Sequence, residues 1–319
     1  MKVQLRRLYA LDVVRFIACF WVLIWHYQHF FMVEPGVLPE GWSRESQPLY
    51  QLFSLFYENN YGVQVFWALS GMVFFYVYWE AVQKRRVGAW QFFVNRVSRL
   101  YPLICITTIV VFIIQQLNIR IFGCYFIYPN NSVLDLLRNL LCIPYIVPND
   151  GPSLNNPFWS VSIELVFYAL FFFMARFSHV PGLIGSAVAL TVFLNSPIPR
   201  FVVGYDRLNS CGRYFFFGGV VWCVFSILAK RARFLVLGMR RFQSLGLLVQ
   251  RMGDVSFGMY LWHVPVQLFL IALCRLGVIP FVPNSPCMLL IFLVCVIAVS
   301  ILSFIYVEVP MRKWIRRLL

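Results

Sequence analysis

The chain has 319 residues, of which 61% are hydrophobic and only 12% are charged, against about 25% charged residues in a soluble globular domain. Its mean hydropathy of +0.75 and its 33 Phe, 16 Tyr and 10 Trp residues are typical of a protein that lies in lipid. The net charge of +15 does not indicate a nucleic-acid partner, because the basic residues form short clusters between apolar segments. These figures exclude an ordinary soluble domain and indicate a multi-pass protein of a lipid bilayer.

Runs of about 20 apolar residues, the length that a helix needs to cross the hydrocarbon core, determine the predicted fold. Eight runs are expected to be membrane helices: 12–32, 61–80, 101–117, 159–178, 181–195, 214–229, 256–276 and 287–309. Weaker apolar stretches at 49–57, 133–147 and 234–249 leave open short spans, re-entrant helices or interfacial helices. The sequence therefore predicts an all-α polytopic transmembrane helical bundle of 8–10 membrane helices.

The basic residues are distributed unevenly between these runs. With the N-terminus inside the cell, nineteen of the 27 Lys and Arg residues fall on the cytoplasmic side and six fall outside, which leaves Arg15 and Arg275 within spans. Cytoplasmic loops are enriched in Lys and Arg, so we expect both termini to be cytoplasmic.

The segments between the runs are short. Pro-rich stretches at 129–157 and 277–286 are expected to be outer loops. Cys124 and Cys142 fall in one predicted outer loop and are candidates for a disulfide, whereas no Cys or His spacing indicates a metal site. We expect a single membrane domain over residues 1–319, with no separate soluble domain and no cleavable signal peptide.

The first span carries two ionisable side chains, Arg15 and His26. Eleven residues separate them, so at about 100° per residue they point to the same side of a helix, about 16 Å apart along its axis. Ionisable groups inside a span are costly, which favours a functional role over a snorkelling Arg15 and a packing role for His26. Asp12, three residues before Arg15, is the expected partner of that arginine.

Two motifs follow along the chain. The second span contains Leu-Ser-Gly, and Ser70 with Gly71 permits close approach of another helix or of a ligand; packing is the favoured reading of this motif alone. The next cytoplasmic loop holds Arg96 and Arg99, three residues apart and just before Pro102. Two guanidinium groups at a membrane mouth suit phosphate oxygens, either of lipid heads or of a phosphorylated cofactor.

Two later spans also carry polar groups. Trp159 opens one span five residues before Glu164, and a Glu in Phe-rich and Leu-rich surroundings needs a partner such as His or Arg, or binds a sugar hydroxyl. Tyr260, Trp262 and His263 lie together in the seventh span. Aromatic rings beside polar groups are typical of carbohydrate-binding surfaces and also of interfacial belts.

In this order, the motifs resemble those of the membrane-bound acyltransferase-3 family, from about residue 8 to residue 314. They are Arg15 with His26, Gly62–Gly71, Arg96-x-x-Arg99-x-x-Pro102, Trp159-Ser160-x-x-x-Glu164, Tyr260-Leu261-Trp262-His263 and Glu308-x-Pro310. The resemblance implies about ten membrane helices, acyl-CoA as the donor substrate and an acceptor hydroxyl on a saccharide. The sequence departs from the family in having eight firm spans, and in lacking the extra C-terminal hydrolase-like domain of some members.

From this resemblance we expect an integral membrane O-acyltransferase of the bacterial inner (cytoplasmic) membrane. The expected acyl group is acetyl, and the expected acceptor is lipopolysaccharide O-antigen, exopolysaccharide or a related glycan. The family implies His26 and Arg15 as catalytic residues. His26 would take the proton of the acceptor hydroxyl, or would itself be acylated, and Glu164 would orient His26 or bind the acceptor.

The other candidate residues divide between donor and acceptor. Arg96 and Arg99 would bind phosphates of acyl-CoA, with Arg15 near the pyrophosphate, and Ser70 or Trp159 would donate a hydrogen bond to the developing oxyanion. The carbohydrate would contact Trp159, Tyr260, Trp262 and His263. We expect no metal and no nucleic acid, and the oligomeric state stays open.

Two other classes of protein compete with the enzyme. Intramembrane Arg, Glu and His also mark substrate paths in transporters and flippases. Inverted repeats and paired broken helices would indicate a transporter, and the sequence shows neither. The cost of several buried ionisable groups argues against a membrane scaffold without chemistry.

Overall fold

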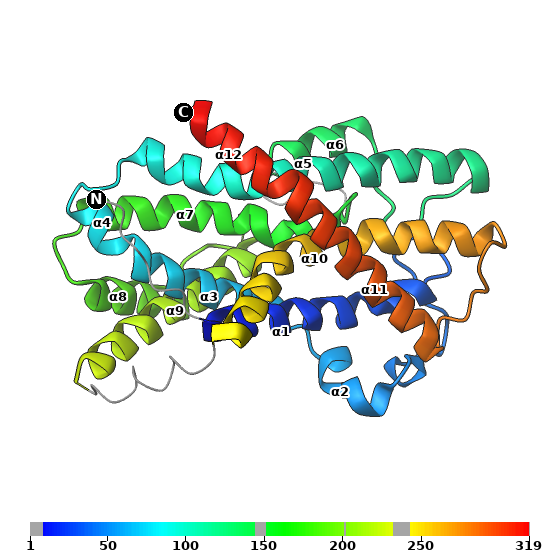
Figure 1. Cartoon of the computed structure of the whole chain (residues 1–319), viewed down its shortest axis with the longest axis horizontal. Helices are drawn as coiled ribbons and strands as arrows, with labels where there is room; N and C mark the ends of the chain where they lie inside the picture. Colours follow the sequence, from blue (N-terminus) through cyan, green and yellow to red (C-terminus); the bar gives the residue numbers. More distant parts are fainter. Residues whose placement is uncertain (1–8, 144–150, 201, 232–242, 319) are drawn as a thin grey trace. The chain divides into compact units, whose positions relative to one another are not determined.

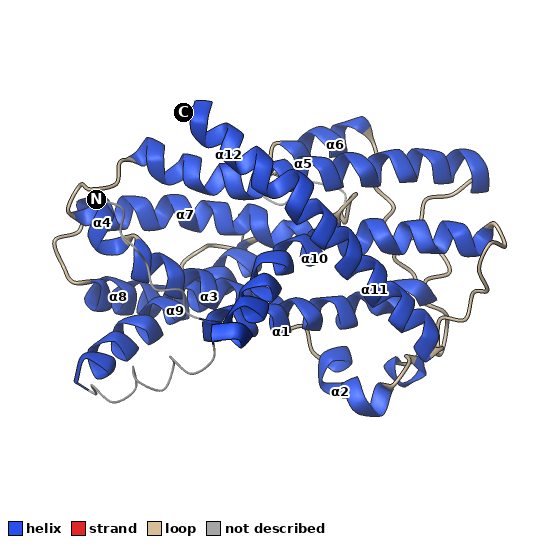
Figure 2. Cartoon of the chain, viewed as in Figure 1, coloured by secondary structure: helices blue, strands red, loops and turns tan. Residues whose placement is uncertain are grey.

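The computed structural model describes residues 9–143, 151–200, 202–231 and 243–318, and helices dominate these residues, with no β-strand among them (Figures 1 and 2). The helices are α1 (Tyr9–His26), η1 (Tyr27–Phe31), η2 (Arg44–Ser46), α2 (Tyr50–Glu58), α3 (Gly62–Val77), α4 (Trp79–Gln83), α5 (Ala89–Phe122), α6 (Val133–Leu140), η3 (Asn156–Phe158), α7 (Trp159–Phe177), α8 (Gly182–Leu194), α9 (Tyr205–Arg231), α10 (Gln243–Arg275), α11 (Pro286–Ser303), η5 (Phe304–Glu308) and α12 (Val309–Leu318).

Six helical segments are long and apolar enough to cross a membrane. They are Tyr9–Phe31, Ala89–Phe122, Asn156–Phe177, Tyr205–Leu228, Val249–Arg275 and Pro286–Arg317. Each covers all or all but one residue of a span expected from hydropathy, because a backbone in hydrocarbon must satisfy its own hydrogen bonds and a helix does so within one segment. The predicted all-α polytopic fold is confirmed.

The remaining two predicted spans are shorter helices. α3 has 16 residues and α8 has 13, which at 1.5 Å per residue gives lengths of about 24 and 20 Å, against a hydrocarbon core of about 30 Å. The weaker stretches at 49–57 and 133–147 form α2 and α6, which have nine and eight residues and are too short to span on their own. The stretch at 234–249 lies largely outside the described residues.

The chain divides into two compact units, which we describe separately. Unit 1 comprises Met1–Ala18, Val63–Val94 and Val161–Asp254. Its interior is aromatic: Phe74 stacks on Tyr168 with ring centroids 4.3 Å apart.

Helices α3 and α9 of unit 1 touch backbone to backbone. A Cβ added at Gly71 would overlap the carbonyl oxygen of Phe215, and one added at Gly218 would overlap that of Ala68. Small residues permit such close packing of membrane helices. The close approach expected at Ser70-Gly71 is therefore confirmed.

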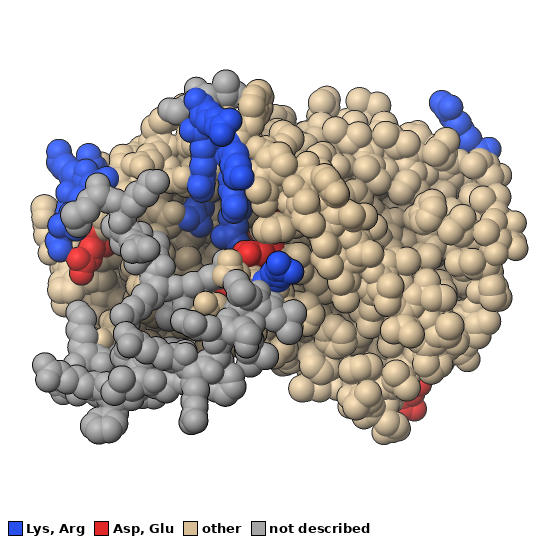
Figure 3. Space-filling model, in the orientation of Figure 1, with Lys and Arg blue, Asp and Glu red and all other residues tan. Residues whose placement is uncertain are grey.

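Unit 2 comprises Cys19–Gly62, Asn95–Ser160 and Val255–Leu319. The rings of Phe30 in η1 and Phe292 in α11 meet edge to face, 5.5 Å apart, within its core. The outer side of α11 is apolar and exposed at Leu290 and Val294. Figure 3 shows few charged atoms over α11, as expected for a surface that faces lipid.

One local expectation was wrong. Arg96 and Arg99 lie on α5 and not in a loop, because the helix continues through Pro102, as membrane helices often do where neighbouring groups satisfy the freed carbonyl. The chain after Glu308 continues as α12, with Pro310 in its first turn, where a helix needs no N–H donor.

Cys124 and Cys142 are both free thiols, so the candidate disulfide does not form. The Cys124 thiol lies 3.8 Å from the guanidinium of Arg275, whereas Cys142 is buried at the end of α6. The basic residues counted in segments 1–8 and 232–242 lie outside the described residues.

Candidate functional site

Three buried histidines meet in the interior of unit 2. His26, His29 and His263 are 7%, 4% and 0% exposed. The ring centroid of His26 lies 5.1 Å from that of His29 and 4.9 Å from that of His263. His26 therefore packs against two other imidazoles and not against acyl lipid.

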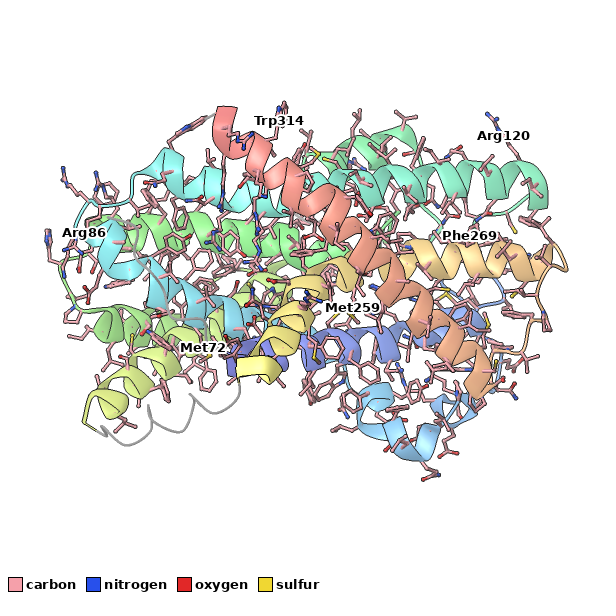
Figure 4. All side chains as sticks on the ribbon, in the orientation of Figure 1. Met72, Arg86, Arg120, Met259, Phe269 and Trp314 are labelled. Carbon is pink, nitrogen blue, oxygen red and sulfur yellow. The ribbon has the colours of Figure 1, made fainter. Side chains whose placement is uncertain are left out.

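The change of helix type after α1 brings His26 and His29 together. α1 ends at His26, and the chain continues as the 3₁₀ helix η1. A 3₁₀ helix has three residues per turn, so side chains three residues apart lie on the same side. His263 comes from α10, where residues 263–268 are all buried and Phe269, labelled on α10 in Figure 4, is exposed.

Hydrogen bonds fix the tautomers of two of these rings. The Nδ1 of His26 lies 2.8 Å from the carbonyl oxygen of Val22, and the Nδ1 of His263 lies 2.7 Å from that of Tyr260. A carbonyl oxygen only accepts, so each Nδ1 carries hydrogen and each neutral ring keeps Nε2 as an acceptor. The Nε2 of His263 is buried and has no hydrogen-bond partner among the described residues.

Gln267 on α10 connects His26 and His29. Its Nε2 donates to the carbonyl oxygen of His26 at 2.9 Å, so its Oε1 accepts from the Nδ1 of His29, also at 2.9 Å. The Nε2 of His29 then accepts from the hydroxyl of Tyr128 at 3.3 Å. All three histidines thus hold their proton on Nδ1.

Asn155 supplies a hydrogen-bond donor that the backbone of α10 lacks near His263. Pro265 lies inside α10 and has no N–H, so the carbonyl of Leu261, four residues earlier, loses its helical donor. The side-chain amide of Asn155 donates to that carbonyl at 2.9 Å. The helix therefore tolerates a proline two residues after His263.

The start of α7 is attached to the same turn of α10. The hydroxyl of Tyr260 donates to the carbonyl oxygen of Pro157, and it lies 2.7 Å from the hydroxyl of Ser160. Trp159, which lies between Pro157 and Ser160 in the sequence, is half-buried. Tyr260, expected to contact carbohydrate, thus has protein partners for its hydroxyl. Trp262 is half-buried, and its Nε1 has no hydrogen-bond partner within the described parts of the chain.

An arginine lies close to His26. The guanidinium of Arg44 lies over the ring of Trp25, 5.3 Å from its centroid, and donates to the carbonyl oxygen of Tyr57 at 2.6 Å. The ring of Trp25 contacts that of His26 edge to face at 4.8 Å. Partial burial lowers the pKa of Arg44, and the carboxylate of Glu58 opposes that shift.

The residues expected to bind the donor fall in both units. Arg15 pairs with Asp12 at 3.1 Å in unit 1, as predicted. Arg96 and Arg99 are half-buried on one side of α5 in unit 2, with Ser98 buried between them.

Glu164 and Ser70 share a partner in unit 1. The hydroxyl of Tyr168 donates to the carboxylate of Glu164 at 2.8 Å and lies 3.3 Å from the hydroxyl of Ser70. Tyr168 follows Glu164 by four residues, one turn along α7, so the two side chains meet on one side of that helix.

Two cavities open beside His29. The larger, of about 250 Å³, is lined by His29, Phe30, Met32, Ile271, Cys274, Arg275 and Phe281. The smaller, of about 110 Å³, shares His29, Met32, Ile271 and Arg275 and adds Val33, Glu34, Pro35 and the segment 124–127. Within the described residues, no group of three His, Cys, Asp or Glu side chains is placed to hold a metal ion.

Sequence reasoning missed four residues of this site. His29 had a visible signal, since a second histidine three residues after His26 extends the polar side of the first span. Gln267 is a polar residue within a span and deserved the same attention. Arg44 and Asn155 gave no signal, because they lie outside the long apolar runs and only the tertiary fold brings them in.

The fold and the buried polar cluster define a multi-pass membrane protein with an interior site. A family model described as an acyltransferase domain, that of the acyltransferase-3 family, matches residues 8–236. The chain therefore belongs to the acyltransferase-3 family of membrane acyltransferases. Neither curated proteins nor solved structures gave a match. The matched segment contains His26, Arg96 and Glu164, and it ends before His263.

Proposed function

We propose that this protein is an integral membrane O-acyltransferase that transfers an acyl group, acetyl in the first instance, from acyl-CoA to a carbohydrate hydroxyl. The acceptor class is lipopolysaccharide O-antigen, exopolysaccharide or a related glycan. The observation that carries this proposal is the buried His26, whose Nδ1 is held by Val22 and whose Nε2 is left to accept a proton. The family match favours an enzyme over a transporter or flippase.

His26 acts as the general base in the proposed reaction. Its Nε2 takes the proton of the acceptor hydroxyl as the hydroxyl oxygen attacks the thioester carbonyl, and coenzyme A leaves as its thiol. In the covalent variant, Nε2 attacks the thioester carbonyl first and coenzyme A leaves as its thiolate. The acceptor hydroxyl then attacks the acyl-imidazole, the acyl–Nε2 bond breaks, and the hydroxyl proton ends on the thiolate. The hydrogen bond to Val22 supports both variants, since it fixes the ring orientation.

The donor is proposed to bind through the arginines. Arg15 lies on α1 about 16 Å from His26 by helix rise, similar to the length of a pantetheine arm. Arg96 and Arg99 lie one turn apart on α5 and suit two phosphate groups. Ser70 is proposed to donate to the oxyanion.

The acceptor is proposed to bind beside His263. Its Nε2 needs a donor, and a sugar hydroxyl supplies one. Trp159, Tyr260 and Trp262 supply aromatic surface in the same unit, and Glu164 is proposed to orient His26 or to bind a sugar hydroxyl.

We further propose that the protein forms one functional membrane domain in the bacterial inner membrane, with both termini cytoplasmic. The support is the charge asymmetry of the sequence, in which nineteen basic residues fall on one side and six on the other.

The test is transfer of label from radioactive acetyl-CoA to cell-envelope glycan in membrane vesicles. His26→Ala should reduce the rate by about 10²- to 10⁴-fold, the usual contribution of a general base. The matched control is His179→Ala, which changes an exposed histidine after α7. Wild-type turnover in the His26→Ala vesicles would overturn the proposal. Trapping an acyl-imidazole without acceptor would select the covalent variant.

A further inference from the structure

Arg275 lies on the wall of both cavities beside His29. It is the last residue of α10 and is exposed, and its guanidinium rests on two neighbouring side chains. The group lies over the ring of Phe126, 4.7 Å from the centroid, and contacts the Cys124 thiol at 3.8 Å. These contacts orient the guanidinium beside the cavities.

No described carboxylate pairs with Arg275. The ion pairs found in the described parts of the chain involve other residues, and the two contacts of Arg275 are with a ring and a thiol. The larger cavity has no acidic residue in its wall, whereas Glu34 lines the smaller one. An anion is therefore favoured in the larger cavity, where Arg275 faces no competing carboxylate.

The larger cavity has the size of a small-ligand site. Its volume of about 250 Å³ lies just below the range of about 300–1,000 Å³ that is usual for small-molecule pockets. That volume suits one sugar residue and not a whole oligosaccharide. The remaining sugars would extend from it.

The cavity also leads to the proposed base. Its wall includes His29, which is only 4% exposed and whose ring centroid lies 5.1 Å from that of His26. Gln267 bridges the two residues through the Nδ1 of His29 and the carbonyl of His26. A ligand in this cavity therefore lies one side chain away from the reacting centre.

Resting on the proposed function, we propose that the larger cavity binds the acceptor by an anionic group, a carboxylate or phosphate carried by its sugar, and that Arg275 holds this group. The protein is then an acyltransferase for acidic glycans. His29 forms the inner wall, past which the acceptor hydroxyl reaches His26.

The test measures ligand binding by protection of cysteines in the purified protein. Cys124 is half-buried and contacts Arg275 on the wall of both cavities, so its alkylation by N-ethylmaleimide, followed by mass spectrometry, reports on occupancy. Cys287 is exposed and serves as the reference. Cys142 should stay unlabelled, because burial raises the pKa of its thiol to about 12 and the reactive thiolate is scarce.

The ligands are glucuronate, glucose 6-phosphate and glucose. At least one anionic sugar should slow labelling of Cys124, and glucose should not. Which of the two anionic sugars protects tells carboxylate from phosphate. Arg275→Ala should raise the concentration for half-protection about tenfold, as expected for loss of one charge-assisted hydrogen bond. Arg275→Lys should keep part of the protection. The matched control is Arg120→Ala, which removes an exposed arginine that projects from the end of α5 in Figure 4.

Two results would overturn the proposal: protection by glucose equal to that by both anionic sugars, or unchanged protection in Arg275→Ala. Labelling needs no acyl donor, so its outcome is independent of the His26 experiment. If transfer did not depend on His26, the proposed function would fail, and the anion site could still be measured. Failure of protection with intact transfer would remove the anion site alone.

Discussion

Unit 1 and unit 2 bury different kinds of side chain. Among the described residues, four buried polar or charged side chains belong to unit 1 and twenty belong to unit 2. Unit 1 instead packs aromatic rings and brings helix backbones together at Gly71 and Gly218. Buried polar groups are costly unless they are paired, so their concentration in unit 2 distinguishes a unit with a polar interior from one with an aromatic interior.

The largest expected effect is a loss of stability from a substitution in unit 1 that changes none of its polar groups. Gly218→Ala adds a Cβ that overlaps the backbone carbonyl of Ala68, so α3 and α9 must separate. We expect a loss of about 3 kcal/mol in the free energy of unfolding, the upper part of the range for overpacked cores. Thermal unfolding in detergent measures it. Gly88→Ala is the control, since an added Cβ there meets nothing within 4 Å. Equal midpoints for the two variants would contradict the close crossing.

The next largest expected effect is a loss of activity from a substitution in unit 2 that leaves the fold intact. His263→Asn keeps a donor for the Tyr260 carbonyl but removes Nε2, whereas His263→Gln places an amide oxygen near the Nε2 position. We expect His263→Asn to lower kcat about 100-fold, similar to loss of one preorganised polar group. His263→Gln should retain more activity at an unchanged unfolding temperature. If the two variants had equal activity, Nε2 would have no role.

A third prediction concerns a polar group of unit 2 that serves the fold. Asn155→Leu removes the donor that replaces the N–H missing at Pro265, and should lower stability by about 2 kcal/mol. Pro265→Ala restores a backbone donor to the Leu261 carbonyl, so it should recover at least half of that loss in the double variant. A double-mutant cycle measures the coupling, and simple additivity would refute the link between the two residues.

The smallest effect lies at α6, away from the histidines. Ser132 and Asp135 form a reciprocal capping box at its start. Ser132→Ala should lower stability by about 1 kcal/mol and leave acyl transfer unchanged, because an N-cap contributes that amount locally. Unfolding in denaturant and the vesicle assay give both values. A large loss of transfer in Ser132→Ala would contradict this expectation, because a polar group with only a structural role would then also affect the chemistry.

Much of the fold could be predicted from the sequence, because a helix needs a minimum length of apolar residues to cross the bilayer. Every long apolar run became a helix, and the pairing of Arg15 with Asp12 followed from their spacing of three residues. Arg96 and Arg99 were expected in a loop just before Pro102, but α5 continues through that proline, because membrane surroundings keep the backbone helical. The chain is also helical at Pro310, because a first turn needs no donor.

The candidate site was predicted in part. The sequence indicated His26 and His263 as ionisable groups inside spans, and the structure brings their rings to 4.9 Å. It gave no means of finding Asn155, whose role depends on a carbonyl 106 residues further along the chain. His29 could have been found, because a residue three positions after His26 lies on the same side in an α-helix and in the 3₁₀ helix η1.

The bridge made by Gln267 has a consequence for hydrolysis. The last carbonyl groups of a helix normally bind water, yet the carbonyl oxygen of His26 takes its hydrogen bond from a buried amide. This carbonyl therefore needs no water. In the reaction proposed above, a thioester brought to this point would meet fewer water molecules able to hydrolyse it, so Gln267 would favour transfer to the acceptor over hydrolysis.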